Sequence, residues 1–341
     1  MTESAAASPT TPEFVQLHRG DPAAVRDELL AGLRAPAPCV APKFLYDALG
    51  SRLFDAITEL PEYYPTRTEA GIFTNHLAEM AAQVPPGAAL VDLGAGSCAK
   101  AARLFGALRP ARYVAVDISV DYLRGALGRL QQQHPALPML GVGQDFSASL
   151  ALPPEALAPT AQGLKPPPVL FYPGSSIGNF SPPEALRFLR QAHALAAGGA
   201  EPQAGAAHGG LLIGVDRVKP AGILEPAYDD PLGVTAAFNR NLLLNVNRLA
   251  GTDFRPADWD HVAFWNAAES RIEMHLQARQ PLTVRWAGGQ RRFETGARIH
   301  TEHSYKWQMA DFDALLRAAG FRQTRAWTDA EGWFAVFWAQ A

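Results

Sequence analysis

The sequence predicts an α/β protein with a doubly wound, Rossmann-like sheet into which a second, α+β domain is inserted. Short apolar runs alternate with helical patterns between Ala88 and about Val218. Such alternation is typical of a mostly parallel sheet with helices on both faces. After Lys219 the alternation gives way to one long helical pattern and then to runs with a period of two. This change of pattern indicates an insertion of different architecture.

The segment before the sheet divides into a tail and two helices. Residues 1–13 are rich in Ala, Ser, Thr and Pro and have neither a basic start nor an apolar core. We therefore expect a disordered tail and not a signal peptide. The spacing of apolar residues predicts helices over 24–36 and 43–58. Thr66 or Thr68 can cap the helix that follows, because each offers an oxygen to free backbone N–H groups.

Five apolar runs in the alternating region have the length of buried strands, and they are 88–92, 113–117, 139–142, 168–172 and 211–216. In the inserted region, the periodicities predict a helix over 232–249 and strands over 271–276, 282–286 and 293–300. A helix over 310–318 then leads to an apolar strand at 333–339. We expect that last strand to return to the first sheet.

Composition argues against several classes of partner. The chain has 341 residues and a net charge of −3, with no basic stripe that would suit nucleic acid. No apolar stretch approaches the roughly 20 residues that a membrane helix needs. Its two cysteines, Cys39 and Cys98, argue against a disulfide framework and suit a reducing cytoplasm. We expect a cytoplasmic monomer that acts on a small molecule.

Residues 91–100, VDLGAGSCAK, hold the densest functional signal. Gly94 and Gly96 follow an apolar strand and precede a helix, so the backbone can turn sharply and approach a ligand closely. The helix then presents free N–H groups to an anionic group. Asp117 closes the next apolar run, where a carboxylate can accept hydrogen bonds from both ribose hydroxyls of a nucleotide.

Such a loop can hold either NAD or S-adenosylmethionine (SAM). Ala99 stands where a dinucleotide fingerprint has its third glycine, which alone does not exclude NAD. Asp145, at the end of a third strand, can accept from an adenine amino group, with Phe146 against the ring. SAM carries a methionyl carboxylate in place of a pyrophosphate, and Lys100 can lie near it. Asp-Leu-Gly-x-Gly at 92–96 followed by Val-Asp-Ile-Ser at 116–119 favours SAM over NAD, and acidic residues at two strand ends together favour a binding site.

A second dense segment, 171–180, leaves a predicted strand at the edge of the sheet where open α/β folds bind ligands. Asn179 offers donors and an acceptor that suit a carboxylate or an amine, although a tight glycine turn explains this residue equally well. Ser181 and Glu184 then predict the start of a helix with a capping box.

Seven motifs occur in a distinctive order: FLYDALGSRLFD at 44–55, LPEYYPTRTEA at 60–70, the Asp92 loop, GSSIGN at 174–179, AYDD at 227–230, FNRN at 238–241 and TEHSYKW at 301–307. Together they resemble the SAM-dependent L-histidine Nα-methyltransferases of ergothioneine biosynthesis, over roughly residues 40–340. The resemblance implies three successive methyl transfers from SAM to the α-amine of L-histidine. The product would be Nα,Nα,Nα-trimethyl-L-histidine, which is called hercynine.

The resemblance also implies site residues, position by position. SAM would lie against Gly94, Gly96, Lys100, Asp117, Asp145 and Phe146. Asn179 and Tyr228 would hold the carboxylate and amine end of the substrate. The imidazole would be surrounded by Tyr63, Met274, Glu302 and Ser304. Tyr46 would lie close to the amine, so the implied catalytic residues are Tyr46, Asn179 and Tyr228. Either Tyr46 or a water can take the proton that the amine releases.

Glu302 and Ser304 also have an independent rationale. In an extended segment, side chains two apart point to the same face, and a carboxylate beside a hydroxyl suits the two nitrogens of an imidazole. Without the resemblance, a surface glutamate and a turn serine would be the simpler interpretation. His300 and His303 could suggest a metal site, but on a strand they point to opposite faces, so we expect no bound metal.

Two other activities fit parts of the sequence. Gly174, Ser176 and Gly178 have the spacing of a hydrolase nucleophile elbow, but the glycine loop and its acidic partners have no role in a hydrolase. The alternative function is a SAM-dependent N-methyltransferase of another amino acid or small amine. That function predicts an apolar residue in place of Glu302.

These patterns divide the chain into two domains. We expect a SAM-binding methyltransferase domain over 66–218 and 301–341, and a substrate-binding domain over 14–65 and 219–300. The second domain is therefore built from two segments that lie far apart in the sequence.

Overall fold

A computed structural model describes residues 11–17, 21–147, 149–159, 163–198 and 208–341. Eight strands form its main sheet in the order β1-β4-β3-β2-β5-β6-β13-β12. Their bounds are β1 Glu13–Gln16, β2 Ala89–Leu93, β3 Arg112–Asp117, β4 Met139–Gly143, β5 Pro168–Tyr172, β6 Gly210–Asp216, β12 Gln323–Thr328 and β13 Phe334–Gln340. The strands from β1 to β6 pair in parallel. The expected return of the last strand is confirmed, because β13 pairs antiparallel with β6.

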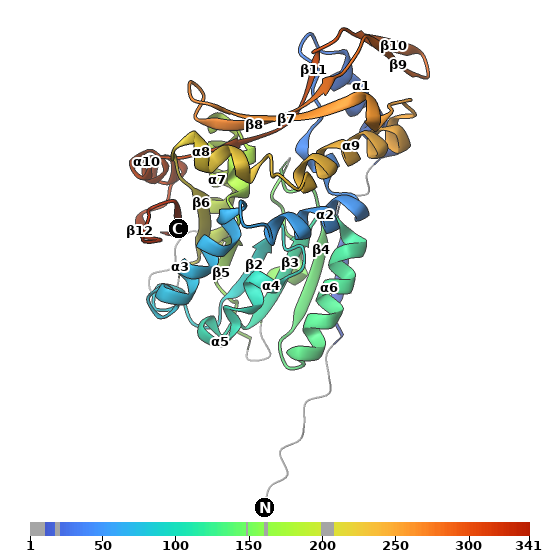
Figure 1. Cartoon of the computed structure of the whole chain (residues 1–341). Coiled ribbons are helices and arrows are strands. Elements are labelled where there is room, and N and C mark those ends of the chain that lie inside the picture. The colour runs from blue at the N-terminus through green and yellow to red at the C-terminus, as the bar shows by residue number, and fades with distance from the viewer. Residues whose placement is uncertain (1–10, 18–20, 148, 160–162, 199–207) are drawn as a thin grey trace, which may run out of the picture.

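Helices cover both faces of this sheet, as predicted (Figure 1). Successive residues of β3 point to opposite sides: Val114 and Val116 belong to the core under the helices α7 and α10, whereas Tyr113 and Ala115 belong to the core under α3 and α6. The bounds are α3 Tyr64–Ala81, α6 Val120–Gln133, α7 Pro182–Ala196 and α10 Met309–Ala319. No helix in the described part of the chain is long and apolar enough to cross a membrane.

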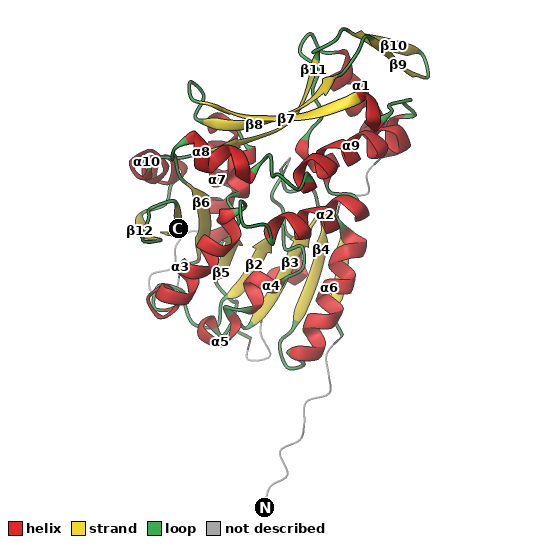
Figure 2. Ribbon diagram, viewed as in Figure 1, coloured by secondary structure: helices red, strands yellow, loops and turns green. Residues whose placement is uncertain are grey.

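A second lobe lies over the carboxyl edge of the main sheet. The antiparallel strands β11, β8 and β7 form its three-stranded sheet, β9 and β10 form a hairpin, and α9 lies between this sheet and α2 (Figure 2). The bounds are α1 Pro22–Arg34, α2 Ala48–Thr58, α9 Val234–Ala250, β7 Trp259–Asn266, β8 Arg271–Ala278, β9 Leu282–Trp286, β10 Gly289–Phe293 and β11 Arg298–Tyr305. The buried residues of its core come from 29–64 and 224–299.

Short helical turns connect these elements. The α-helical turns are α4 Ala99–Ala102, α5 Phe105–Leu108 and α8 Ala221–Leu224. The 3-10 turns are η1 Pro42–Leu45, η2 Pro154–Leu157, η3 Ser176–Asn179, η4 Glu225–Ala227 and η5 Pro256–Asp258. Several of them follow a strand of the main sheet at its carboxyl end, so they place loops at the edge that faces the second lobe.

We propose the same two-domain division that the sequence predicts, with two boundaries moved. Residues 13–16 form β1, which pairs with β4 at the edge of the main sheet, so the substrate-binding domain does not begin at 14. β11 runs through the predicted boundary at 300/301 and pairs with β8 along its length, so the boundary moves to its end. Most of the predicted tail, residues 1–10, lies outside the described residues.

Two local predictions need correction, and the sequence does not predict the strands β7 and β12. The predicted strand over 293–300 is interrupted, because Phe293 ends β10 and β11 begins only at Arg298. Neither Thr66 nor Thr68 caps a helix, because α3 already begins at Tyr64 with Pro65 in its first turn. The strands β7 and β12 lack a clear apolar signal, since β7 mixes aromatic and polar residues and β12 is largely exposed. Pairing with a buried neighbour holds each of them, β7 on β8 and β12 on β13.

The capping box of α7 yields a stability prediction. Glu184 accepts a hydrogen bond from the backbone N–H of Ser181 over 2.9 Å. The Glu184→Ala variant should lower the free energy of unfolding by about 1 kcal/mol, because this N–H loses its acceptor. Urea unfolding at pH 7 measures the change. Glu184→Gln is the matched control, since its amide oxygen can still accept, and an equal loss in both variants would contradict the capping role.

Candidate active site

The glycine loop after β2 turns as the sequence predicts. Gly94 and Gly96 have φ angles of 72° and 50°, a left-handed conformation that favours glycine. The N–H of Gly96 donates to the Asp117 carboxylate over 2.9 Å and joins the loop to the end of β3. A Cβ on Gly94 would lie 3.7 Å from the Phe146 ring, so the bare glycine keeps the space between them open. We call this region, lined by the loop, Asp117, Asp145 and Phe146, the cofactor cradle.

Two carboxylates stand at the ends of neighbouring strands in this cradle. Burial raises the pKa of Asp117, although backbone N–H groups of Ser119 and Gly96 oppose the shift. Burial also disfavours the ionised form of Asp145, but hydrogen bonds from Ser147 and Lys43 outweigh it and lower the pKa. Both carboxylates offer acceptors at the edge of β3 and β4. This arrangement suits the hydroxyl and amino donors of a nucleoside.

Sequence patterns do not reveal two other charged residues at the cradle. Lys43, from the second lobe, lies with its Nζ 3.0 Å from an Asp145 oxygen. Glu69 of α3 is buried and accepts from Lys100 Nζ over 2.7 Å and from the backbone N–H of Gly174 over 2.7 Å. Glu69 therefore fixes Lys100 between the loops that follow β2 and β5. A helical pattern marks Glu69 only as a polar residue, so this role needs the tertiary structure.

A cavity that is partly open to solvent lies beside the cradle. The wall contains every residue that the sequence places around the substrate: Tyr46, Tyr63, Asn179, Tyr228, Met274, Glu302 and Ser304. Gly174 and Ser176 also line it, and Gly174 is the residue that Glu69 connects to Lys100. The loop after β5 therefore lies between the cavity and Lys100, which follows the glycine loop of the cradle.

Aromatic rings from both segments of the second lobe build the rest of the wall. The Tyr46 ring centroid lies 5.5 Å from those of Phe54 and Phe238, and the Phe54 ring packs on Tyr63 at 6.1 Å. Helical spacing marks Phe54 and Phe238 as core positions, but only the contact of α2 with α9 turns them towards the cavity. Burial raises the pKa of Tyr46, Tyr63 and Tyr228 well above the usual value, so all three phenols keep their protons.

Glu302 is the cavity residue with the most unusual surroundings. It pairs with Met274 across β11 and β8, and both side chains line the cavity. Burial raises the pKa of Glu302 to about 7, while the charge of Lys306 opposes the shift. Within the described part of the chain its Oε2 atom is buried and has no hydrogen-bond partner. Such an acceptor is costly unless a ligand supplies a donor.

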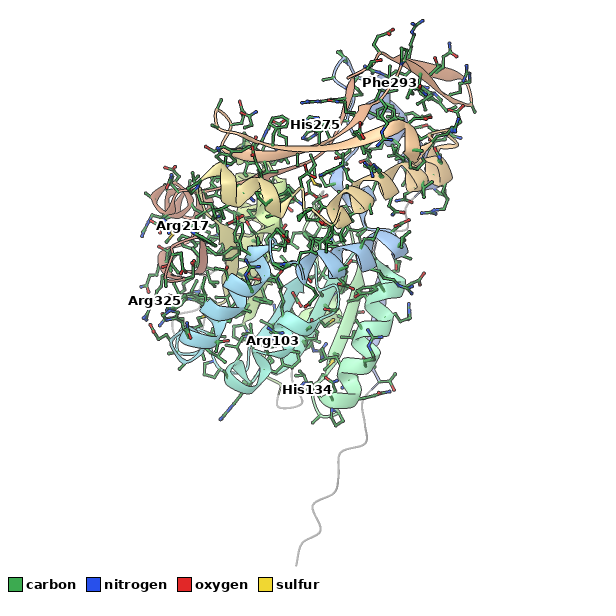
Figure 3. The ribbon with its side chains drawn as sticks, viewed as in Figure 1. Arg103, His134, Arg217, His275, Phe293 and Arg325 are labelled. Atoms are coloured by element: carbon green, nitrogen blue, oxygen red, sulfur yellow. The ribbon has the colours of Figure 1, made fainter. Side chains whose placement is uncertain are left out.

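The prediction that His300 and His303 point to opposite faces is wrong. Their rings stack at 5.5 Å, because the strand register shifts between His300 and Glu302 and a bulge adds a residue. The His300 ring also packs on His275 at 5.1 Å, and His275 projects from the side of the small sheet that faces away from the main sheet (Figure 3). Among the described residues, no three His, Cys, Asp or Glu side chains are placed to hold a metal ion.

The serine at the elbow-like spacing does not have the surroundings of a hydrolase nucleophile. Ser176 Oγ donates to the backbone carbonyl of Pro173 over 3.3 Å. Of the residues described by the structure, no histidine lines the cavity beside it. A nucleophilic serine needs such a base within hydrogen-bond reach.

A family model described as histidine-specific, SAM-dependent methyltransferase matches residues 25–341. The chain belongs to this family. As a histidine-specific methyltransferase it uses SAM, and the cradle fits that cofactor: glycines leave room for it, acidic strand ends offer acceptors, and Lys100 offers a cation. When bound, SAM supplies an electrophilic methyl group on its sulfonium.

The names of similar proteins are consistent with this family. The histidine N-alpha-methyltransferase of Mycolicibacterium smegmatis is 40% identical over 320 residues, which cover 92% of this chain and 94% of that protein. That of Mycobacterium tuberculosis is 38% identical, over 94% of this chain and 96% of its own. The ergothioneine biosynthesis protein 1 of Neurospora crassa is 31% identical over 83% of this chain, which matches 31% of that protein.

Cofactor binding by this methyltransferase gives a prediction for Asp117. The Asp117→Ala variant should weaken SAM binding by about 1–3 kcal/mol, because the ribose hydroxyls lose a charged acceptor. Calorimetric titration with SAM measures the loss. Asp121→Ala, an exposed acidic residue at the start of α6, is the control and should bind normally. Unchanged affinity in Asp117→Ala would remove this carboxylate from the cofactor site.

Glu302 gives a prediction for stability against pH. Its pKa of about 7 in the folded enzyme exceeds the ordinary 4.5, so the folded state holds this proton more tightly than the unfolded state does. The resulting stabilisation is complete below about pH 4.5 and is lost as pH rises through 7. Glu302→Gln lacks this titration. Its unfolding free energy relative to wild type should therefore rise by about 1–3 kcal/mol from pH 5 to pH 8.

Urea unfolding of the ligand-free enzyme at both pH values measures this difference. Glu294→Gln, which removes an exposed carboxylate from the same lobe, is the control and should show no such change with pH. A constant difference between Glu302→Gln and wild type at the two pH values would mean that Glu302 ionises normally.

Proposed function

We propose that this enzyme transfers three methyl groups in succession from SAM to the α-amine of L-histidine, giving hercynine in ergothioneine biosynthesis. One observation carries the choice of substrate: a Glu302 oxygen that has no partner among the described residues lies in the wall of a partly aromatic cavity beside the cofactor cradle. The N–H of an imidazole is a donor that fits this acceptor, and the ring suits the aromatic walls.

We assign the cavity residues to parts of histidine. Glu302 and Ser304 would bind the two ring nitrogens, while Met274 and Tyr63 would lie against the ring. Asn179 and Tyr228 would hold the carboxylate and amine end. Tyr46 would lie beside the amine. These roles agree with the position of the cavity, because its Gly174 side borders the cradle and its Glu302 side belongs to the second lobe.

We assign the residues of the cradle to parts of SAM in the same way. Asp117 would accept from the ribose hydroxyls and Asp145 from the adenine amino group, with Phe146 along the adenine ring. Lys100 would pair with the methionyl carboxylate, and Gly94 and Gly96 would allow the close approach. Glu69 would hold Lys100 in place, since the two side chains are 2.7 Å apart.

The α-amine must be neutral to attack the methyl group. A free α-amine has a pKa of about 7.7–8.0, so only a modest shift is needed at neutral pH. Burial raises the pKa of the Tyr46 phenol, so Tyr46 keeps its own proton at neutral pH. Without a phenolate form, it is a poor acceptor of the proton that the amine releases. A lone pair on its oxygen can still accept an N–H and orient the nitrogen, and water then carries the proton away. Water is therefore favoured over Tyr46 as the base.

The alternative, methylation of another amino acid or small amine, has less support. It calls for an apolar wall where this chain has a buried, ionisable Glu302. A monomeric state and a cytoplasmic location stay predictions from the sequence.

Substrate choice gives the sharpest test of this function. Glu302→Ala should lower kcat/KM for histidine by at least about tenfold, equivalent to roughly 1.4 kcal/mol, because the imidazole loses its acceptor. It should also narrow the gap to larger apolar aromatic amino acids such as tryptophan, especially together with Met274→Val, since the unpaired carboxylate is gone and the ring pocket is wider.

Mass spectrometry of products from histidine, phenylalanine, leucine and tryptophan, with wild type and both variants, measures the change. Wild type should methylate histidine and be a very poor catalyst for phenylalanine and leucine. Full preference and rate for histidine in Glu302→Ala would show that this carboxylate does not bind the imidazole.

A further inference from the structure

A buried lysine stands directly behind the substrate cavity. Lys306 follows β11, and its side chain is inaccessible to solvent. Its Nζ lies 2.8 Å from Asp216 Oδ2, 2.8 Å from Tyr228 Oη and 2.8 Å from Ser304 Oγ. An ammonium has three N–H donors and no acceptor, so these three contacts use all of them. Lys306 therefore has no proton left for a ligand and can act only through Tyr228 and Ser304.

The two hydroxyls that Lys306 contacts also contact each other. Tyr228 Oη and Ser304 Oγ are 2.9 Å apart and both side chains line the cavity. Lys306 fills one lone pair on each oxygen, and one hydroxyl proton bridges the pair. No hydrogen bond within the described part of the chain takes the second hydroxyl proton. That proton is available to a ligand in the cavity, which both side chains line.

We propose that Lys306 is a positioning residue for histidine recognition: anchored on Asp216, it orients Tyr228 and Ser304 so that the pair presents one O–H donor to the substrate. The inference rests on the proposed function. A neutral imidazole has one N–H and one bare nitrogen. Glu302 would accept from the N–H, and the oriented hydroxyl pair would serve the bare nitrogen through Ser304 or the substrate carboxylate through Tyr228.

Lys306 also acts on the charge of Glu302. The groups that face this carboxylate are the protonated phenols of Tyr46, Tyr63 and Tyr228 and the Lys306 ammonium. Burial raises the pKa of Glu302, and the Lys306 charge opposes that shift. Loss of Lys306 would leave Glu302 protonated over more of the neutral range. A single residue thus supports both the donor and the acceptor of the ring pocket.

Lys219 provides a matched comparison. It is also buried, and it pairs with the other oxygen of the same Asp216 carboxylate. Its remaining side-chain partners are the Tyr64 phenol, 2.8 Å away, and the carbonyl of Arg217. Neither partner lines the cavity. Removing either lysine takes one cation from Asp216. Only removal of Lys306 also takes a hydrogen-bond donor from the hydroxyls of Tyr228 and Ser304.

The test compares Lys306→Met with Lys219→Met for KM and kcat of the first methylation of L-histidine. Lys306→Met should raise KM by at least about tenfold with kcat changed by less than about threefold, because ring binding contributes to ground and transition states alike. Lys219→Met should keep KM within about threefold of wild type, although thermal melting should show both variants destabilised. Binding of S-adenosylhomocysteine, which occupies the cradle, should be unchanged in both and reports correct folding.

Each outcome decides the inference. A wild-type KM in folded Lys306→Met overturns it, and so does an equal rise in Lys219→Met, because the effect would then come from Asp216 alone. If Lys306→Met does not fold, Lys306→Gln replaces it with a shorter neutral side chain, and the same criteria apply. Failure of wild type to methylate histidine would instead refute the proposed function, and with it the substrate on which this inference rests.

Discussion

The buried charges of Asp216, Lys219 and Lys306 join the two lobes, and the geometry of the active site depends on them. Asp216 ends β6 in the main sheet, whereas Lys306 follows β11 in the small sheet. Each charge alone would cost several kcal/mol in this buried position, so the cluster is tolerable only when its members are together. The backbone reinforces the junction, because the N–H of Trp307 donates to the Asp216 carbonyl over 3.0 Å.

This junction fixes where the substrate cavity lies relative to the cofactor cradle. Ser175, in the loop after β5, accepts from the Asp216 N–H over 2.8 Å, while Ser304 and Tyr228 contact Lys306 from the other lobe. Methyl transfer requires the two reacting groups at close range and in line. The same site contains groups that destabilise the free protein, Glu302 above all. A protein gains selectivity from such groups when the ligand supplies the missing partner.

Much of the fold follows from local patterns. The five predicted parallel strands and the returning strand β13 are continuous apolar runs, and the helix at 234–250 has apolar residues at helical spacing, since each is buried against the core. The edge strand β1 and the mixed strand β7 lack such a pattern, because a neighbouring strand holds them more than their own side chains do. The bulge that stacks His300 on His303 is also invisible in the sequence, since it depends on register with β8.

For the site, the sequence by itself determined which chemical groups are present: glycines that permit a sharp turn, acidic residues at strand ends, and the motifs that resemble those of the family. It could do so because these features depend on residue type and short spacing. Only the tertiary structure decided the partners of Glu69, Lys43 and Lys306. Each makes its contacts with residues distant in the chain or in another element, and the high cost of burying charge, which makes those contacts necessary, leaves no local periodicity to read.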